Sequence, residues 1–155
     1  MSEPLCTWSE PVLDEWIDYN GHLSEPYYVL VLGHATDAVM DAVGLGPAYR
    51  EETDSSLYTV EAHVRYLDQV SPGEHLEARS WVIGATGKLL WIWHELHAGA
   101  PGAQTLRATE EILGLHVTGS RSSPFPGDVH ATITRHLTAP PEHASRSIRV
   151  GSPAT

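Results

Sequence analysis

An acid, a glycine and a histidine lie close together just before a predicted helix. The segment from Asp18 to His22 contains Gly21 and precedes Ser24, a good N-cap residue, and Pro26, which suits the first turn of a helix. That first turn presents backbone N–H donors and a partial positive charge. A carboxylate facing such donors pairs a base or nucleophile with an oxyanion site. The sequence therefore indicates acyl-transfer chemistry.

Each residue of this segment has more than one possible role. Asp18 can activate water, attack a carbonyl carbon directly, or simply cap the turn before the helix. His22 can donate a hydrogen bond to Asp18 or to a substrate carbonyl, or it can fix the loop. Pro26 has no N–H, so we expect the backbone N–H of Glu25 or of Tyr27 to stabilise the oxyanion.

The length and composition of the chain limit the classes of protein to which it can belong. The chain has 155 residues, 41% of them apolar, which suits one domain with a real core. Its formal charge of −11 argues against a nucleic-acid partner. Cys6 is the single cysteine, no apolar run is long enough to cross a bilayer, and the first residues lack signal-peptide features. We therefore expect a cytoplasmic protein without disulfides or membrane contacts.

The periodicity predicts one long helix followed by four strands. Apolar residues recur at helical spacing from Pro26 to Val43, and Gly44 ends the pattern. Gly33, inside this helix, predicts close packing against a sheet. Further expected segments are an edge strand within residues 1–17, a polar connection at 50–56, strands at 60–66, 74–84, 89–97 and 105–117, and a short helix at 128–134.

This order predicts an α+β fold in which a curled antiparallel sheet wraps around one helix. Residues 1–138 are expected to form the single domain. Prolines and small polar residues predict a disordered tail over residues 139–155.

The element order and the motif before the helix resemble the hotdog-fold acyl-CoA thioesterases of the 4-hydroxybenzoyl-CoA thioesterase type. Their motif reads Asp-x-x-Gly-His-x-Asn, with a tyrosine four residues after the asparagine. Asp18, Gly21, His22 and Tyr28 match it, whereas Ser24 occupies the position of the asparagine. The resemblance spans residues 8–136 and implies a hotdog fold and hydrolysis of a thioester to a carboxylate and free CoA. A single curled sheet around one helix leaves a sheet edge and an apolar face exposed, so we also expect a homodimer or a dimer of dimers. No cofactor is expected beyond the CoA of the substrate.

Several segments resemble more narrowly the betainyl-CoA thioesterases of carnitine catabolism, which also occur fused to carnitine dehydrogenase. A small, cationic acyl group is therefore the expected substrate. The segments that carry this resemblance are residues 16–22, 35–37, 44–46, 61–67 and 121–126.

Substrate contacts are predicted around the motif and on two strands. Tyr28 can face the substrate or simply belong to the helix core. Glu61 can balance a cationic acyl group, and Trp91 and Trp93 share a strand face that can hold a quaternary ammonium or pack in the core or a dimer interface. The predicted acyl-binding residues are Asn20, Ser24, Tyr28, Glu61, Trp91 and Trp93.

No phosphate loop or metal motif is present in the sequence. The CoA phosphates would depend on scattered basic residues, of which Arg65, Lys88 and Arg121 are the candidates, although each can equally be solvated surface. His94 and His97 would point to opposite faces of a strand, so no metal site is expected.

Two other functions remain open from the sequence. A hotdog enoyl-CoA hydratase or dehydratase would use the same fold for proton transfer on the acyl chain, and a non-catalytic acyl-CoA binding module would need no base. The acid placed before the helix favours the thioesterase.

Overall fold

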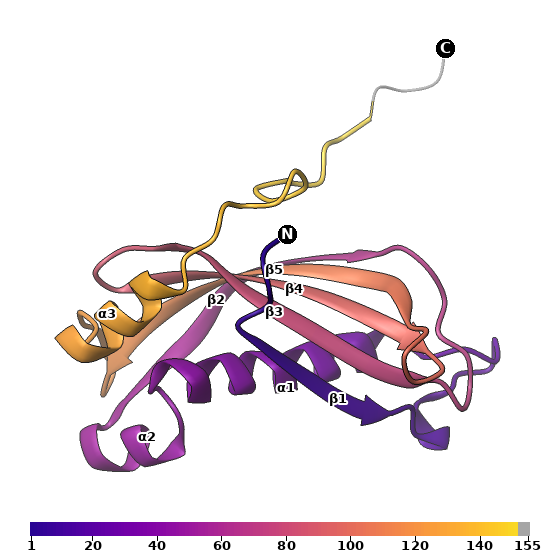
Figure 1. Cartoon of the computed structure of the whole chain (residues 1–155), viewed down its shortest axis with the longest axis horizontal. Coiled ribbons are helices and arrows are strands. Elements are labelled where there is room, and N and C mark those ends of the chain that lie inside the picture. Colours follow the sequence, from indigo (N-terminus) through magenta and orange to yellow (C-terminus); the bar gives the residue numbers. More distant parts are fainter. Residues whose placement is uncertain (152–155) are drawn as a thin grey trace.

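The computed structural model describes residues 1–151. An antiparallel six-stranded sheet with the order β1-β3-β4-β5-β2, and with β6 beside β5, curls around helix α1 (Figure 1). The predicted α+β hotdog fold is confirmed. The elements in chain order are β1 (Cys6–Pro11), the 3-10 turn η1 (Asp14–Trp16), α1 (Glu25–Val43), α2 (Pro47–Thr53), β2 (Ser55–Tyr66), β3 (His75–Ala85), β4 (Leu89–Gly99), β5 (Thr105–Thr118), β6 (Arg121–Ser122) and α3 (Gly127–Arg135).

Helix α1 forms where its apolar spacing predicted. Ser24 is the N-cap residue, but its side chain makes no capping hydrogen bond, contrary to the expectation from its type. Gly44 ends the helix in the left-handed region, with φ of 89°, which glycine adopts without strain. One face of α1 packs against the inner, concave face of the sheet, and its buried residues are Tyr28, Val31, Leu32, Ala35, Thr36, Val39 and Val43.

The predicted polar connection at residues 50–56 is wrong, because Pro47–Thr53 form the short helix α2. No residue of α2 is buried, so the sequence carries no apolar period that would reveal it. Pro47 in the first turn and the ion pair between Arg50 and Asp54, one turn apart, stabilise this helix on the surface.

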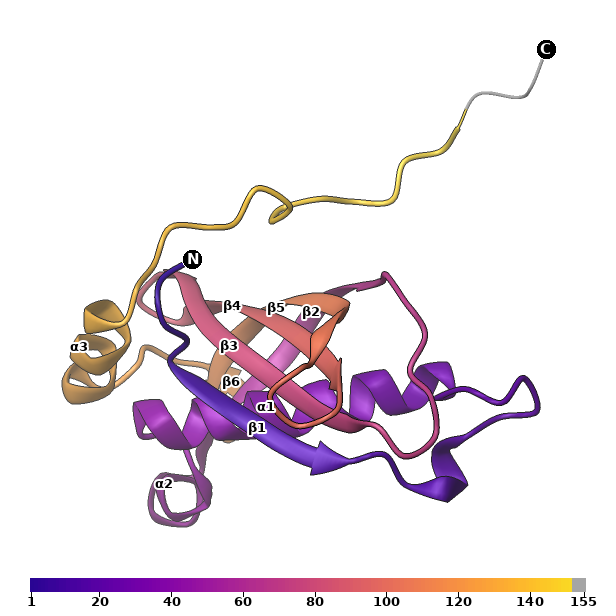
Figure 2. The same ribbon diagram turned by 45° about the vertical axis from the view of Figure 1, so that its right-hand side comes forward.

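The outer face of the sheet carries an aromatic cluster. Trp81, Ile83 and Trp93 are buried there, and Ala144 of the C-terminal segment packs against them. The N–H of Ser145 donates to Glu111 Oε2 at 2.6 Å. Figures 1 and 2 show the segment that follows α3 on the side of the sheet away from α1. The disorder expected from residue 139 onward stays a prediction, and residues 152–155 lie outside the described residues.

Within residues 1–151, no single helix has the length and apolarity to cross a membrane. Helices α1 and α2 have the length and composition of a membrane span only when they are taken together, and the pair is bent by 65°.

His94 ties α1 to the sheet from inside the core. Its Nδ1 lies 2.7 Å from Ser80 Oγ and its Nε2 lies 3.0 Å from Thr36 Oγ1 on α1. The ring is fully buried, and this burial lowers the pKa of His94 to about 3. The imidazole is therefore neutral at physiological pH and serves as a hydrogen-bonded core residue.

The buried neutral His94 is expected to make the fold sensitive to acid. Its pKa is 6.5 in the unfolded chain and about 3 in the folded one. Because the unfolded state holds the extra proton between these values, the free energy of unfolding should fall as the pH drops, by up to about 1.4 kcal/mol per pH unit. Urea titrations at several pH values should show a shallower acid dependence in His94→Gln than in the wild type. Parallel pH profiles would contradict this role.

Candidate active site

The loop before α1 is a closed turn organised by Asp18. The Asp18 N–H donates to the His22 carbonyl at 3.0 Å, and the Gly21 N–H donates to the Asp18 carbonyl at 2.9 Å. Gly21 has φ of +80°, a conformation that favours glycine. The Asn20 N–H donates to Asp18 Oδ1 at 2.8 Å, so this carboxylate is held in the turn and is half-buried. Within residues 1–151, the side chains of Asp18 and His22 make no hydrogen bond to each other.

Two backbone hydrogen bonds fix this turn to its neighbours. The Leu23 N–H donates to the Val70 carbonyl in the β2–β3 connection, and the Ser24 N–H donates to the Trp16 carbonyl in η1, both at 2.9 Å. Leu23 and Trp16 are buried. The position of Asp18 therefore depends on two segments that lie on either side of it.

The first turn of α1 offers a free backbone donor. The Tyr27 N–H already donates to the Ser24 carbonyl at 3.0 Å, and Pro26 has no N–H. The Glu25 N–H has no hydrogen-bond partner in the part of the chain that is described. Of the two predicted oxyanion donors, Glu25 is therefore the one whose N–H is available to a substrate.

Two tyrosines flank this turn. The Tyr28 hydroxyl donates to the Asp68 carbonyl at 3.1 Å, and its buried ring meets the edge of Tyr66 at a centroid distance of 5.2 Å. The Tyr66 hydroxyl donates to Glu25 Oε1 at 3.2 Å. Burial, and next the Glu25 carboxylate, raise the pKa of Tyr66 to about 12. Both rings line a cavity of about 650 Å³ beside the first turn of α1.

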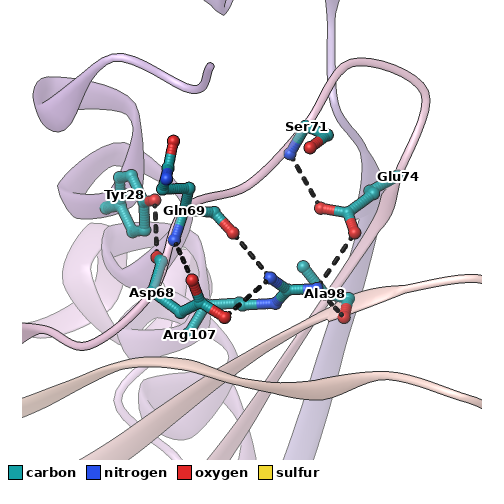
Figure 3. A network of polar contacts seen from close by, with 7 residues as sticks. All are labelled: Tyr28, Asp68, Gln69, Ser71, Glu74, Ala98 and Arg107. Carbon is teal, nitrogen blue, oxygen red and sulfur yellow. Dashed lines mark hydrogen bonds and ion pairs between the residues drawn. The ribbon is translucent and has the colours of Figure 1, made fainter.

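Arg107, on β5, makes three contacts with the β2–β3 connection and one with β4, all shown in Figure 3. Its Nη1 donates to Asp68 Oδ2 at 3.2 Å and to the Gln69 carbonyl at 2.6 Å. Its Nη2 donates to Glu74 Oε1 at 3.0 Å and to the Ala98 carbonyl at 3.3 Å. The connection contains Val70, the acceptor for the loop before α1, so Arg107 positions that loop from a distance. Sequence reasoning did not single out Arg107.

Three predicted acyl-binding residues lie away from the loop. Glu61 and Trp91 line a cavity of about 270 Å³ on the outer face, together with Glu111 and Ser145. Trp93 is buried in the aromatic cluster of that face. Within one chain, these residues face away from α1 and share no cavity with Asp18.

The three basic residues predicted to bind CoA lie at two separate places in the structure. Lys88 Nζ donates to Ser122 Oγ at 3.2 Å, next to Arg121, near the end of β5. Arg65 is paired with Thr109 on β5, and the Lys88 carbonyl accepts the His116 N–H. Seven residues of β5 separate these positions, which corresponds to about 23 Å. Within one chain, Lys88 and Arg121 therefore lie near each other and Arg65 lies apart from them, and the predicted CoA contacts of all three stay predictions.

A larger cavity lies between α1 and the strands β2 and β5. Its volume is about 690 Å³, and Pro26, Gly33, Asp37, Ile112 and Glu110 are among the residues that line it. A Cβ on Gly33 would meet nothing within 4 Å, so the predicted close packing of this glycine against the sheet is wrong. Gly33 instead borders open space.

Glu110 is a buried acid that sequence reasoning missed. It is 3% exposed, and its Oε2 has no hydrogen-bond partner within the described chain. Burial raises the pKa of Glu110 to about 7. The sequence shows two adjacent glutamates, and only the sheet register reveals that Glu110 faces inward while Glu111 faces outward. Across residues 1–151, no cluster of three or more His, Cys, Asp or Glu side chains could hold a metal ion.

The family model and the related sequences that match this chain are all those of thioesterases. The model of the thioesterase-like superfamily matches residues 12–133. A betainyl-CoA thioesterase of Pseudomonas aeruginosa is 43% identical over 86% of this chain and 84% of its own length. An L-carnitine dehydrogenase/betainyl-CoA thioesterase of Ruegeria pomeroyi is 31% identical over 96% of this chain, which spans 31% of that protein.

Solved structures share the fold. A hypothetical protein of Staphylococcus aureus in complex with CoA superposes with a TM-score of 0.83, at 23% identity, over 94% of each chain. A gentisyl-coenzyme A thioesterase superposes with a TM-score of 0.72, at 14% identity, over 83% of this chain and 99% of its own.

The fold and the loop before α1 define a hotdog thioesterase, and the chain belongs to the thioesterase-like superfamily. It is a thioester hydrolase that acts on acyl-CoA.

Proposed function

We propose that this protein hydrolyses betainyl-CoA to betaine and free CoA. The observation that carries the proposal is the 43% identity to the betainyl-CoA thioesterase of Pseudomonas aeruginosa, over nearly the full length of both chains. The pathway that this substrate implies is carnitine catabolism, and the compartment is the cytoplasm. No cofactor is required beyond the CoA of the substrate.

The loop before α1 supplies the chemistry in this proposal. Asp18 either activates a water molecule or attacks the thioester carbonyl directly, and the turn that holds it serves both routes equally. The Glu25 N–H, with the partial positive charge of the helix start, stabilises the oxyanion that forms on the carbonyl oxygen. His22, Asn20 and Ser24 border the same loop and orient the acyl end of the substrate.

The CoA end of the substrate needs a basic contact for its phosphates. Lys88 and Arg121 lie near each other beside β6 and are the pair best placed to supply it. Arg65, on the other part of β2, would contact a different part of the ligand or solvent.

Release of free thiol tests the proposed function. The purified protein is incubated with betainyl-CoA, butyryl-CoA and isovaleryl-CoA, and thiol release is followed with a chromogenic reagent. Betainyl-CoA should give the highest kcat/KM. Thiol release that favours the neutral esters would reject the cationic substrate but keep the hydrolase. A hydratase would instead change an enoyl-CoA without releasing thiol, and a binding module would do neither.

We also propose that the protein is a homodimer, or a dimer of dimers, joined through β2. Strand β2 is an edge strand, and apolar side chains on it and on the adjacent face of α1 are exposed: Val60 at 53%, Tyr58 at 47%, Val29 at 43% and Leu30 at 42%. A long edge with exposed apolar residues pairs readily with another strand. A second copy at this edge would cover them.

Val60→Glu is expected to weaken this dimer, because two charges would face each other at the paired edge. Sedimentation at micromolar protein should show a dimer for the wild type and a lighter species for Val60→Glu. The matched control is Ile148→Glu, since Ile148 is 90% exposed on the C-terminal segment. A monomeric wild type would rule out the dimer.

A further inference from the structure

The cavity between α1, β2 and β5 contains an acid without a partner. Glu110 is almost completely buried, yet its Oε2 accepts no hydrogen bond in the described chain. Its neighbour Glu111 points to the other face and accepts the Ser145 N–H. Burying a carboxylate without a hydrogen-bond partner costs free energy of folding. We therefore expect the Glu110 carboxylate to be paired with a group from outside the chain.

The other walls of the cavity define what that partner can be. Met40 and Ile112 supply apolar surface, Val29 and Leu30 add to it where the proposed second copy would close the cavity, and Asp37 adds a second carboxylate. His34 also borders the cavity, but its Nδ1 is held by Glu10 Oε2 at 2.6 Å. Neither lysine nor arginine is among the residues of the described chain that line the space. The cavity therefore favours a cation with an apolar surface.

The cavity extends to the first turn of α1, where the proposed oxyanion donor lies. Pro26, in the first turn of α1, is one of its walls, next to the free Glu25 N–H. Tyr66 lies on β2 two residues after Val64, which pairs with Glu110, and its hydroxyl donates to Glu25. A short acyl group bound at the first turn can therefore extend toward Glu110.

We propose that Glu110 is the specificity-determining residue that selects a quaternary ammonium group in the acyl part of the substrate. This inference rests on the proposed thioesterase function and deepens it. A trimethylammonium group has no N–H to donate, so it needs a nearby negative charge and apolar contacts for its methyl groups, rather than directed hydrogen bonds. Glu110 and the apolar walls around it supply both.

The test compares two substrates of the same shape. In tert-butylacetyl-CoA, a carbon atom replaces the nitrogen of betainyl-CoA and removes its charge. Glu110→Gln should lower kcat/KM for betainyl-CoA by at least about tenfold, because the buried charge pair is lost. The kcat/KM for tert-butylacetyl-CoA should stay within about threefold, since glutamine keeps the shape of the side chain and this neutral substrate has no charge to pair with Glu110.

Two other variants are matched controls. Glu111→Gln changes the adjacent glutamate on the outer face, and Glu61→Gln changes the acid first predicted to balance the cation. Both should leave the ratio of the two kcat/KM values unchanged. A loss of selectivity in Glu61→Gln, with Glu110→Gln unaffected, would overturn the proposal.

A second measurement uses only the wild-type protein and so does not depend on the folding of a variant. The pKa of Glu110 is raised to about 7 by burial, and the titratable groups that face it are His94, which lies opposite it on β4, together with His34, Asp37 and Tyr66. The preference for betainyl-CoA should therefore increase from about pH 6 to about pH 8, as Glu110 ionises. The ratio of the two substrates cancels any titration that affects the chemical step alone.

The outcomes separate this inference from the proposed function. Absence of thiol release from any acyl-CoA by the wild type would reject the function itself. Hydrolysis with the same selectivity in the wild type and in Glu110→Gln would reject the role of Glu110 alone. An equal loss on both substrates would show that Glu110 takes part in the chemistry and does not select the acyl group.

Discussion

Replacing Asp18 with asparagine is expected to lower kcat by about a hundredfold or more, whichever role the carboxylate has, because a lost base or nucleophile costs at least this much. The substitution preserves the shape of the side chain, and the amide oxygen can still accept the Asn20 N–H that holds the turn. The melting temperature should therefore stay close to that of the wild type. Steady-state thiol release on betainyl-CoA and thermal unfolding measure the two effects.

Asp14→Asn is the matched control for this prediction, since Asp14 is an exposed acid in η1, four residues before Asp18. Its turnover should be that of the wild type. Nearly normal turnover in Asp18→Asn would remove Asp18 from the chemistry. For an essential Asp18, mass spectrometry after many turnovers in heavy-oxygen water tests the nucleophilic role. Heavy oxygen in the Asp18 carboxylate would show that Asp18 forms an acyl anhydride that water opens at the aspartyl carbonyl, because a general base takes up none.

Arg107→Ala is expected to reduce the free energy of unfolding by about 2–3 kcal/mol, because it leaves a half-buried carboxylate and two carbonyls without their charged donor. This loss corresponds to a fall in melting temperature of roughly 5–10 °C for a chain of this size. The side chains of Arg107 and Glu74 are 16% and 21% exposed, so solvent screens their ion pair only in part. Urea and thermal unfolding measure the change.

The Arg107→Ala variant should also lose activity beyond its loss of stability. The β2–β3 connection that Arg107 holds accepts the Leu23 N–H through Val70, so its release loosens the turn that contains Asp18. We expect kcat to fall several-fold even where the variant is fully folded. Arg79→Ala is the control, because Arg79 pairs with Glu77 in a more exposed position, on β3. Equal effects of the two substitutions would refute the positioning role.

The fold could be predicted from the sequence because its elements have strong local signals. Helix α1 follows from apolar spacing with Gly44 at its end, and the strands follow from alternation and from turns such as Thr86-Gly87. Helix α2 gave no such signal, since it buries no residue. Strand β2 begins at Ser55, five residues earlier than expected, and its register shifts between Thr59 and Glu61, an irregularity that alternation alone does not reveal.

The site could be predicted only where neighbours in sequence are also neighbours in space. The turn from Asp18 to His22 and the missing N–H of Pro26 are local features, so their geometry could be predicted. Arg107 depends on contacts with the β2–β3 connection, about forty residues away, and the environment of Glu110 depends on α1, which lies still further away in the sequence. Alternation could not show which strand face meets α1 and which is covered by Ala144, so it could not place Glu61, Trp91 and Trp93 on the outer face, and their contact with the substrate stays a prediction.

The two edges of the sheet are unequal, and this inequality limits how copies of the chain can associate. Strand β1 has six residues and ends in Pro11, which has no N–H to donate, whereas β2 has twelve residues. A contact between β1 of one copy and β2 of the next would leave a free edge at each end and could add copies without limit. Pairing of β2 with β2 uses the same surface on both copies and leaves only the short, proline-ended β1 edges outside. The sheet therefore favours closed association over growth into fibres.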